Sequence, residues 1–507
     1  MKTLTKDFFK NKKIKNNMII FIILFGISIL IFIPWLKIHY SIDDYTIATR
    51  GYDAYARYWS LKDGRLFQFV WLEIASLIKM PVNIFIRLNV LLSIIISIFS
   101  VMLIYNKMLK IKQEQITDIS ENSNDKISTK SKISLLIVSY ITIFNFMYID
   151  CMYYVESTVM SISILLNILA AMKIIDGNKK DIITSSILVL ISSFCYQGTI
   201  CVYITFTYFM LLLKRKSTKD AAIKIIQCLV ISFFSMIANY IFMKIQITKL
   251  GIIQDRIGSF KNIKDNLHYI QENTYKILTD SCTLYPKYIF IVFLEIAYAI
   301  SIFKLETKDL LRTVMLFIIS ILSSSIFFIL TKTSFDCGRM RISIGMILGM
   351  MYLIILLREK EKNKANRILE TIEIFAILIY ILTTIINFEI IMIEQSKVNN
   401  LEKNEANEIY QYVKEYEEKT GIEVKNYVEV VDIENYKKSA YSNLKVNVNS
   451  MNISGIRHYN LSYSTFYFYT GLKLSCKDSI DNYQINMNND NGYECFNDTL
   501  YVKIYRA

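Results

Sequence analysis

The sequence predicts an all-α polytopic membrane protein of about eleven transmembrane helices, followed by a small α+β domain. Of the 507 residues, 53% are hydrophobic, and the mean hydropathy is +0.34. This is more apolar than a soluble chain of ordinary composition. The apolar residues gather into blocks of about 17–25 residues, a length that matches the hydrocarbon core of a bilayer. Glycine (14) and proline (3) are scarce, which excludes a loop-rich or disordered chain.

The predicted helices begin with an apolar block at 18–34, which follows a lysine-rich N-terminus. No small-residue cleavage site follows this block, so we expect a retained first helix and not a cleaved signal peptide. The other blocks that we expect to span the membrane lie at 86–105, 133–149, 157–175, 182–195, 198–213, 221–243, 287–303, 313–330, 342–357 and 369–388.

The distribution of lysine and arginine predicts one topology. The basic segments are the N-terminus, 106–132, 176–181, 214–220, 304–312 and 358–367. They alternate with the other loops, so the positive-inside rule puts the N-terminus in the cytoplasm and the C-terminus outside a plasma membrane. Because the lysines act as topology signals, the net charge of +14 does not indicate nucleic-acid binding. The segments expected outside are 35–85, 150–156, 196–197, 244–286, 331–341 and 389–507.

The stretch 66–79 (LFQFVWLEIASLIK) is apolar but contains Gln68 and Glu73 and is short for a span. We expect it to lie as a helix in the outer interface, with Trp59 and Trp71 at headgroup depth. The alternative, a twelfth span, would invert every later loop against the lysine rule.

The composition changes near residue 399, and we divide the chain into a transmembrane domain (1–390) and a soluble extracytoplasmic domain (391–507). In the second domain, 401–419 has the pattern of an amphipathic helix. Cys476 and Cys495 are its only cysteines, and an oxidising exterior permits a disulfide that the sequence alone does not decide. The expected strands are 427–431, 444–448, 463–469 and 499–505.

The first outer loop carries the strongest candidates for chemistry. Asp43 and Asp44 are adjacent, Arg50, Arg57 and Arg65 follow, and aromatic residues lie between them. A carboxylate can take a proton from an attacking hydroxyl, and arginine binds phosphate through two donors. The alternative is a solvated acidic turn near a helix end.

A second group in the segment 331–341 comprises Lys332, Asp336, Arg339 and Arg341. These cations either hold an anionic headgroup or extend from a helix end to the interface. Other polar residues at expected outer helix ends are Glu156, Tyr196 and Gln197, each of which is also compatible with a plain interfacial role.

Several function classes lack their sequence signatures. None of His39, His268 and His458 has a partner at metal-ligand spacing, so a zinc centre is not expected. The chain has no Walker motif, no GxGxxG and no GxSxG, which argues against an ATPase, a dinucleotide enzyme and a serine hydrolase.

The acidic pair after the first helix, the W-x-x-x-x-G-R motif from Trp59 to Arg65, Glu156, and the Tyr196–Gln197 pair occur in one order. This pattern resembles the Gtr type II glucosyltransferase domain family, over about residues 20–360 and without the C-terminal domain. The resemblance implies a GT-C-like enzyme that modifies bacterial surface polysaccharide. It implies a polyprenyl-phosphate-sugar donor, namely undecaprenyl-phosphate-glucose, used on the outer face.

The resemblance maps the family's acidic pair onto Asp43 and Asp44. We expect one of them to deprotonate an acceptor hydroxyl, and a single displacement would invert the anomeric carbon. The sequence leaves open whether a divalent cation assists, and it names no certain cofactor. We expect phosphate to be bound by Arg65, Arg339, Arg341 and Lys332, and substrate to be contacted by Arg50, Arg57, Trp59, Glu156, Tyr196 and Gln197.

Two other function classes stay open at this point. A lipid-linked sugar flippase or other transporter would need polar residues near the middle of several spans. The expected spans hold few, such as Glu295, Glu370 and Glu373. A non-catalytic envelope assembly or adhesion protein would display the C-terminal domain without needing the polar cluster of the first loop.

Overall fold

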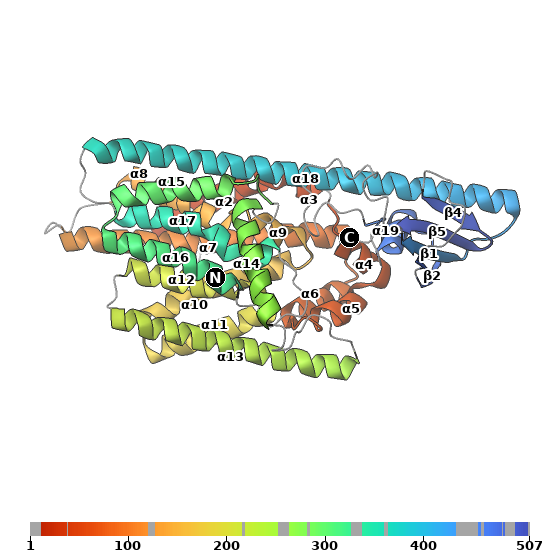
Figure 1. Ribbon diagram of the computed structural model, residues 1–507, viewed down its shortest axis with the longest axis horizontal. Helices are drawn as coiled ribbons and strands as arrows, with labels where there is room; N and C mark the ends of the chain where they lie inside the picture. Colours follow the sequence, from red (N-terminus) through yellow and green to blue (C-terminus); the bar gives the residue numbers. More distant parts are fainter. Residues whose placement is uncertain are drawn as a thin grey trace, which may run out of the picture.

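We describe the fold from a computed structural model of the chain. It is a helical bundle that carries a small sheet at one end (Figure 1). The residues described are 12–37, 39–119, 127–214, 218–251, 263–280, 284–325, 337–358, 364–431, 455–457, 461–478, 480–481 and 492–504.

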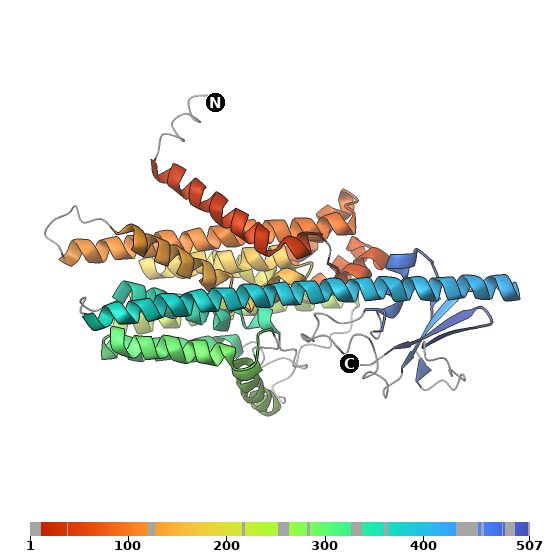
Figure 2. The same cartoon turned by 90° about the horizontal axis from the view of Figure 1, so that it is seen from above.

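Every apolar block expected from the sequence contributes to a helix of the bundle. Helix α2 leans away from its neighbours (Figure 2). The bundle helices are α2 (Lys12–Ile31), α3 (Ile33–Lys37), α7 (Val82–Ile119), α8 (Thr129–Ile143), α9 (Tyr148–Tyr153), α10 (Ser157–Asp176), α11 (Lys179–Cys195), α12 (Ile200–Leu213), α13 (Thr218–Leu250), α15 (Ile289–Lys304), α16 (Thr307–Ser325), α17 (Ile342–Arg358) and α18 (Lys364–Thr420).

Within the described residues, four helices are long and apolar enough to cross a membrane. A fifth is added if α2 and the segment after it, bent by 79°, form one broken span. These lengths support a membrane protein but do not confirm eleven spans. Other apolar helices are short: α12 has 14 residues and α17 has 17, and at 1.5 Å per residue both are shorter than a hydrocarbon core of about 30 Å. The four helices are Val82–Thr117, Ser157–Ile175, Lys219–Leu250 and Ile368–Thr420.

The longest helix, α18, joins the bundle to the sheet. Its 57 residues give a length of about 85 Å, and it runs along the bundle and past the sheet (Figures 1 and 2). The apolar block at 369–388 and the polar amphipathic helix at 401–419 are therefore one continuous helix, which crosses the expected domain boundary at residue 390.

Short helices lie between the bundle and the sheet (Figure 1). Helices α4, α5, η1 and α6 lie there and are built from the segment after α3, and α6 corresponds to the helix expected at 66–79. Helix α6 contacts α5, η1 and α11, whereas α14, an amphipathic helix, contacts α15. Their bounds are α4 (Ile42–Arg50), α5 (Tyr52–Tyr55), the π-helix η1 (Ala56–Ser60), α6 (Leu66–Leu77) and α14 (Ile263–Asp280), and two 3-10 turns are η2 (Gln197–Thr199) and η6 (Gly338–Met340).

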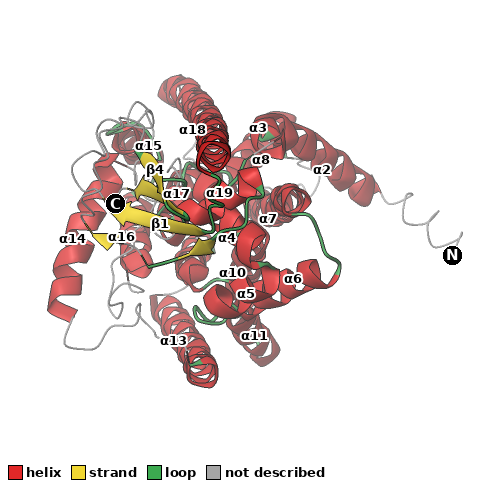
Figure 3. Ribbon diagram, turned by 90° about the vertical axis from the view of Figure 1, so that its right-hand side faces the viewer, coloured by secondary structure: helices red, strands yellow, loops and turns green. Residues whose placement is uncertain are grey.

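The sheet has the strand order β2-β1-β5-β4, with β3 paired to β1. Strand β5 is parallel to β1 and antiparallel to β4. Seen from the sheet end, α18 stands beside the strands and α19 lies close to α4 (Figure 3). The bounds are β1 (Asn426–Val431), β2 (Ser475–Cys476), β3 (Ile480–Asp481), β4 (Tyr493–Phe496), β5 (Thr499–Ile504) and α19 (Ser462–Thr470).

Two of the expected strands are confirmed as β1 and β5, and the one expected at 463–469 is wrong, because this segment forms α19. Its aromatic residues favour a strand. As a helix, however, the segment packs against α4, α18 and β1 together, and Gly471, with φ of 68°, ends it. The strand expected at 444–448 lies outside the described residues.

Cys476 and Cys495 do not form a disulfide; both are free thiols. Cys476 is paired with Tyr427, Tyr427 with Leu500, and Leu500 with Cys495, in one row across the sheet. Three strand spacings separate the two cysteines by about 14 Å, about twice the Cα separation that a disulfide bridges.

Candidate functional site

The acidic pair lies in the first turn of α4, beyond the bend that ends the apolar segment Lys15–Ile31. Ser41 is the N-cap residue of α4, and Asp44, at the third helical position, forms a capping box with it. Its Oδ2 accepts from the Ser41 backbone N at 2.6 Å and from Ser41 Oγ at 2.7 Å. Asp44 therefore stabilises the start of the helix that carries Asp43.

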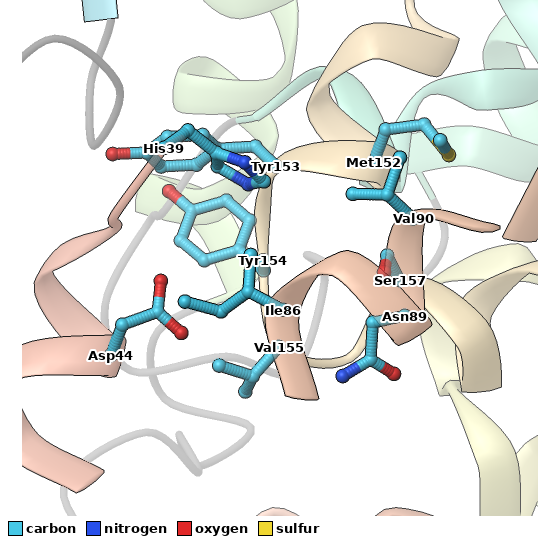
Figure 4. A pocket seen from close by; sticks show the side chains of 10 residues that line it. All are labelled: His39, Asp44, Ile86, Asn89, Val90, Met152, Tyr153, Tyr154, Val155 and Ser157. Atoms are coloured by element: carbon cyan, nitrogen blue, oxygen red, sulfur yellow. The ribbon is translucent and has the colours of Figure 1, made fainter. Parts of the chain in front are cut away.

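The other Asp44 oxygen, Oδ1, is buried and has no hydrogen-bond partner among the described residues. Asp44 lines a narrow hollow between α4, α7 and the segment 152–157 (Figure 4). His39 and Tyr154 line the same hollow, and Ser157 adds a second buried oxygen without a partner in the described structure. Burial raises the pKa of Asp44 to about 8, against the opposing effect of its bonds from Ser41.

Asp43 has different neighbours. Burial raises the pKa of Asp43 to about 7, the charge of Glu156 adds to the rise, and Arg339, the Tyr55 hydroxyl and Arg65 oppose it. These four groups lie close enough to Asp43 to influence its ionisation. A carboxyl group with this pKa is about half ionised near neutral pH, which suits a general base.

Arg65 lies at the centre of the cluster. It pairs with Glu156 through Nη1 at 2.8 Å and with Asp63 through Nη2 at 3.3 Å. Its guanidinium carbon lies 4.9 Å from the centre of the Tyr196 ring. Its Nε is buried and has no hydrogen-bond partner among the described residues.

The turn before Arg65 explains the glycine of the W-x-x-x-x-G-R motif. Gly64 has φ of 72°, and a Cβ there would lie 2.6 Å from Asn239 Oδ1. Asn239 donates to the Gly64 carbonyl at 2.8 Å, and Gln197 donates to the Asp63 carbonyl. Gln197 also donates to Asn239 at 2.9 Å. The two amides hold the turn and so direct Arg65 toward Glu156.

Arg339 approaches the same tyrosine from the 3-10 turn η6. Its Nε donates to the Tyr196 hydroxyl at 3.2 Å. Asp150 accepts from the Arg339 backbone N at 2.8 Å and from Nη1 at 3.1 Å. The guanidinium carbon lies 4.0 Å from the centre of the Tyr154 ring. Two guanidinium groups therefore meet on one tyrosine, although about 270 residues separate them in the chain.

The structure brings Asp43, Arg65, Glu156, Tyr196 and Arg339 together, and Gln197 supports them. The other residues expected to bind phosphate or substrate lie elsewhere in the structure, except Lys332, which is outside the described residues. The guanidinium of Arg341 is fully buried and donates to Ser324 and Ser325 at the end of α16, so it is not grouped with Arg339. Arg57 is exposed and pairs with Asp53, Arg50 is exposed at the end of α4, and Trp59 packs against Tyr55, Tyr58 and Lys62.

Sequence reasoning missed Tyr55, Asp63, Asp150, Tyr154 and Asn239. A signal existed for Asp150, because it is an acid between two apolar blocks, six residues before Glu156, and an acid in such a setting is a functional candidate. Asn239 had no local signal, since it lies within α13 and its partners, the Gly64 carbonyl among them, belong to other segments of the chain.

Among the described residues, no group of three or more histidine, cysteine or acidic side chains is placed to hold a metal ion. The arrangement offers a carboxyl group that titrates near neutrality beside two guanidinium groups. These groups can move a proton from a hydroxyl and can bind an anionic leaving group.

The family model described as glucosyl transferase GtrII matches residues 34–339, more than half of the chain. The match begins just before the acidic pair and ends at Arg339, so it encloses the whole cluster and leaves out α18 and the sheet. No curated protein and no protein of solved structure matches the chain. The chain belongs to the GtrII glucosyltransferase family.

Proposed function

We propose that this glucosyltransferase transfers glucose from a polyprenyl-phosphate-glucose donor to a hydroxyl of a surface polysaccharide or other envelope glycan. The reaction takes place on the outer face of the plasma membrane. The observation that carries this proposal is the position of Asp43, whose pKa of about 7 is set beside Glu156, Arg339 and Arg65. A base beside cations fits attack on a sugar whose leaving group is a phosphate.

In this mechanism Asp43 takes the proton from the acceptor hydroxyl. The acceptor oxygen forms a bond to the anomeric carbon as the bond from that carbon to the phosphate oxygen breaks. The lipid leaves as its phosphate monoester, and the single displacement inverts the anomeric centre. We assign the base to Asp43 and not to Asp44, because Ser41 uses the Asp44 carboxylate as a helix cap and because Arg339 and Arg65 act on the ionisation of Asp43.

Arg65 and Arg339 bind the phosphate. Each already pairs with a carboxylate, Glu156 and Asp150 respectively, so a phosphate is met by their remaining donors. Arg65 Nε is such a donor, buried and without a partner in the described structure. The ion pairs hold both guanidinium planes in position before the donor binds, which lowers the cost of ordering them.

The lipid nature of the donor is supported by the apolar helices around the site. The site lies at the sheet end of the bundle, the end that the lysine distribution assigns to the exterior. A lipid carrier supplies an activated sugar where nucleotide sugars are absent. We assign charge neutralisation at the leaving phosphate to the arginines, and loss of transfer in EDTA would show that a divalent cation assists them.

The test uses the full-length protein in proteoliposomes with polyprenyl-phosphate-glucose, measuring both transfer to glycan and donor hydrolysis. Asp43→Asn is expected to lower the rate by about 10²-fold or more, because the amide cannot take the proton. The matched control is Asp53→Asn, which removes a half-exposed carboxylate of the same loop whose ion pair is with the exposed Arg57. This control is expected to keep its activity.

A second variant separates the two adjacent acids. In Asp44→Asn the amide oxygen can still accept from Ser41, so we expect most of the activity to remain. Full activity of Asp43→Asn, with normal membrane insertion, would refute the role of Asp43. Loss of activity in Asp44→Asn alone would transfer that role to Asp44.

A further inference from the structure

Helix α4 has a second face, which packs away from the arginine cluster. Residues two apart on a helix point in directions about 200° apart. Tyr45 therefore lies opposite Asp43 and is almost fully buried, at 1% exposed. Its neighbours come from α18 and α19, in the part of the chain that the family match leaves out.

The contacts of Tyr45 form a closed polar network. Its hydroxyl donates to Glu402 Oε2, a carboxylate with no exposed surface. Asn399 donates to the same hydroxyl at 2.9 Å and to Glu402 at 3.1 Å. The hydroxyl also lies 2.9 Å from that of Tyr469. A buried carboxylate with these partners is costly to leave unpaired, so the network resists separation of α4 from α18.

The segment before α4 is held in the same way. The Asn399 side chain accepts from the Tyr40 backbone N at 2.9 Å and donates to the Tyr40 carbonyl at 3.0 Å. The Phe468 ring packs against the rings of both Tyr40 and Tyr45, with centroid separations of 4.8 and 5.2 Å. Side chains of α18 and α19 thus fix both the entry to α4 and its first turn.

The chain passes close to Tyr45 and Glu402 at Gly455, where there is no room for a side chain. The Gly455 backbone N donates to Glu402 Oε1. A Cβ on this residue would lie 2.4 Å from Thr465 Oγ1 and 3.1 Å from the Tyr45 ring. At the far end of α4, Thr49 donates to the Ser464 carbonyl at 3.3 Å. The contact therefore extends along α4 from its start to its last turn.

We propose that the C-terminal domain is a positioning device for the reaction: Glu402 and Tyr45 hold α4 so that Asp43 meets the acceptor hydroxyl beside Arg65 and Arg339. This proposal rests on the function proposed above for Asp43. Glu402 and Tyr45 touch neither substrate nor reacting atoms and act through α4. The family-matched part of the chain therefore contains the chemistry, and the appended domain sets its geometry.

The experiment compares Tyr45→Phe and Glu402→Gln in the full-length protein. Tyr45→Phe keeps the ring packing against Phe468 and removes only the hydroxyl, and Glu402→Gln keeps the shape of a buried acceptor. The matched control is Glu417→Gln, on the same helix, whose carboxylate pairs with Lys414 and accepts from Val424 N without contacting α4.

Two measurements are made on each variant: kcat and KM for the donor, and hydrogen exchange of the α4 backbone amides. We expect Tyr45→Phe to lower kcat about tenfold with KM changed less than about twofold, because donor binding stays intact while the base is displaced. The α4 amides should exchange about tenfold faster. Glu402→Gln should show the same changes to a smaller extent, and Glu417→Gln neither.

Faster α4 exchange with an unchanged kcat would overturn the positioning role, as would a lowered kcat with unchanged exchange. A rise in KM equal to the loss of kcat/KM would also overturn it, since it would place the effect in binding. These results are distinct from failure of the proposed function, which is detected by full activity of Asp43→Asn.

Discussion

The two regions that meet on α4 hold it by different interactions. On the bundle side, Asp43 faces ionised groups, with Arg65 paired to Glu156 at 2.8 Å and Arg339 to Asp150 at 3.1 Å. On the C-terminal side, Tyr45 meets hydroxyl, amide and aromatic groups around the carboxylate of Glu402. One helix of nine residues thus separates a charged surface from a hydrogen-bonded and packed one.

This difference indicates which contacts of α4 take part in the reaction and which hold the helix in position. Removing one partner of a buried ion pair leaves a charge uncompensated and costs about 3–5 kcal/mol. A hydrogen bond to a charged group, such as that from Tyr45 to the Glu402 carboxylate, contributes about 1.5–3 kcal/mol. We therefore expect changes on the bundle side of α4 to affect transfer most, and changes in the C-terminal domain to affect it less.

The largest effect is expected from Arg65→Ala. It removes a phosphate ligand and leaves Glu156 buried without its cation, so kcat/KM should fall by about 10³-fold. Arg312→Ala is the control, because this arginine is partly exposed and pairs loosely with Asp309 at 3.7 Å. Donor-dependent transfer is the measurement. Equal loss in both variants would mean that Arg65 has no special role and that the bundle side is only structural.

The dependence of kcat/KM on pH tests the bundle side of α4 further, and its expected effect is of intermediate size. Since burial raises the pKa of Asp43 to about 7, the carboxylate form is lost as the pH falls through 7. We expect kcat/KM to fall about fivefold from pH 7 to pH 6, as a single ionising group with this pKa predicts. Asp53→Asn should show the same fall in kcat/KM between pH 7 and pH 6. A fall centred near pH 4 instead would show that the cluster does not raise the pKa of Asp43.

The smallest effect is expected in the sheet. Cys476 and Cys495 lie in one row on β2 and β4, with β1 and β5 between them, so a reductant should shift the Tm by less than about 1 °C. Exposed Cys476 should react with a maleimide in the folded protein, and a Cys476→Ser variant should lose this labelling. A reductant-sensitive Tm would mean that the two thiols pair.

The helices of the bundle were predictable because each block of apolar residues is a local signal. Every such block contributes to a helix, but the expected strand at 463–469 is α19. There the aromatic residues that favour a strand are placed by contacts with α4 and α18, and tertiary packing overrides local preference. The continuity of α18 was also missed, because its polar half reads as the start of a separate domain.

The candidate site was predictable in part. Glu156, Tyr196 and Arg339 lie next to apolar blocks, and Asp43 and Arg65 lie in the charged first outer loop. These positions mark them without any knowledge of the fold. Arg341 stands only two residues from Arg339, yet it turns to Ser324 and Ser325 at the end of α16. Asn239 and Tyr55 gave no signal, since their roles depend on segments far away in the chain.

The sequence by itself determined that this protein is helical, that several of its helices are apolar enough to cross a membrane, and which family it resembles. Periodicity, block length and motif order are properties of the chain read locally. Only the tertiary structure decided that Arg65 and Arg339 come close enough to Asp43 to influence its ionisation, and that Glu402 reaches Tyr45 across more than 350 residues. A turn of 100° per residue sends neighbours to different partners, and the identity of those partners depends on how distant segments pack.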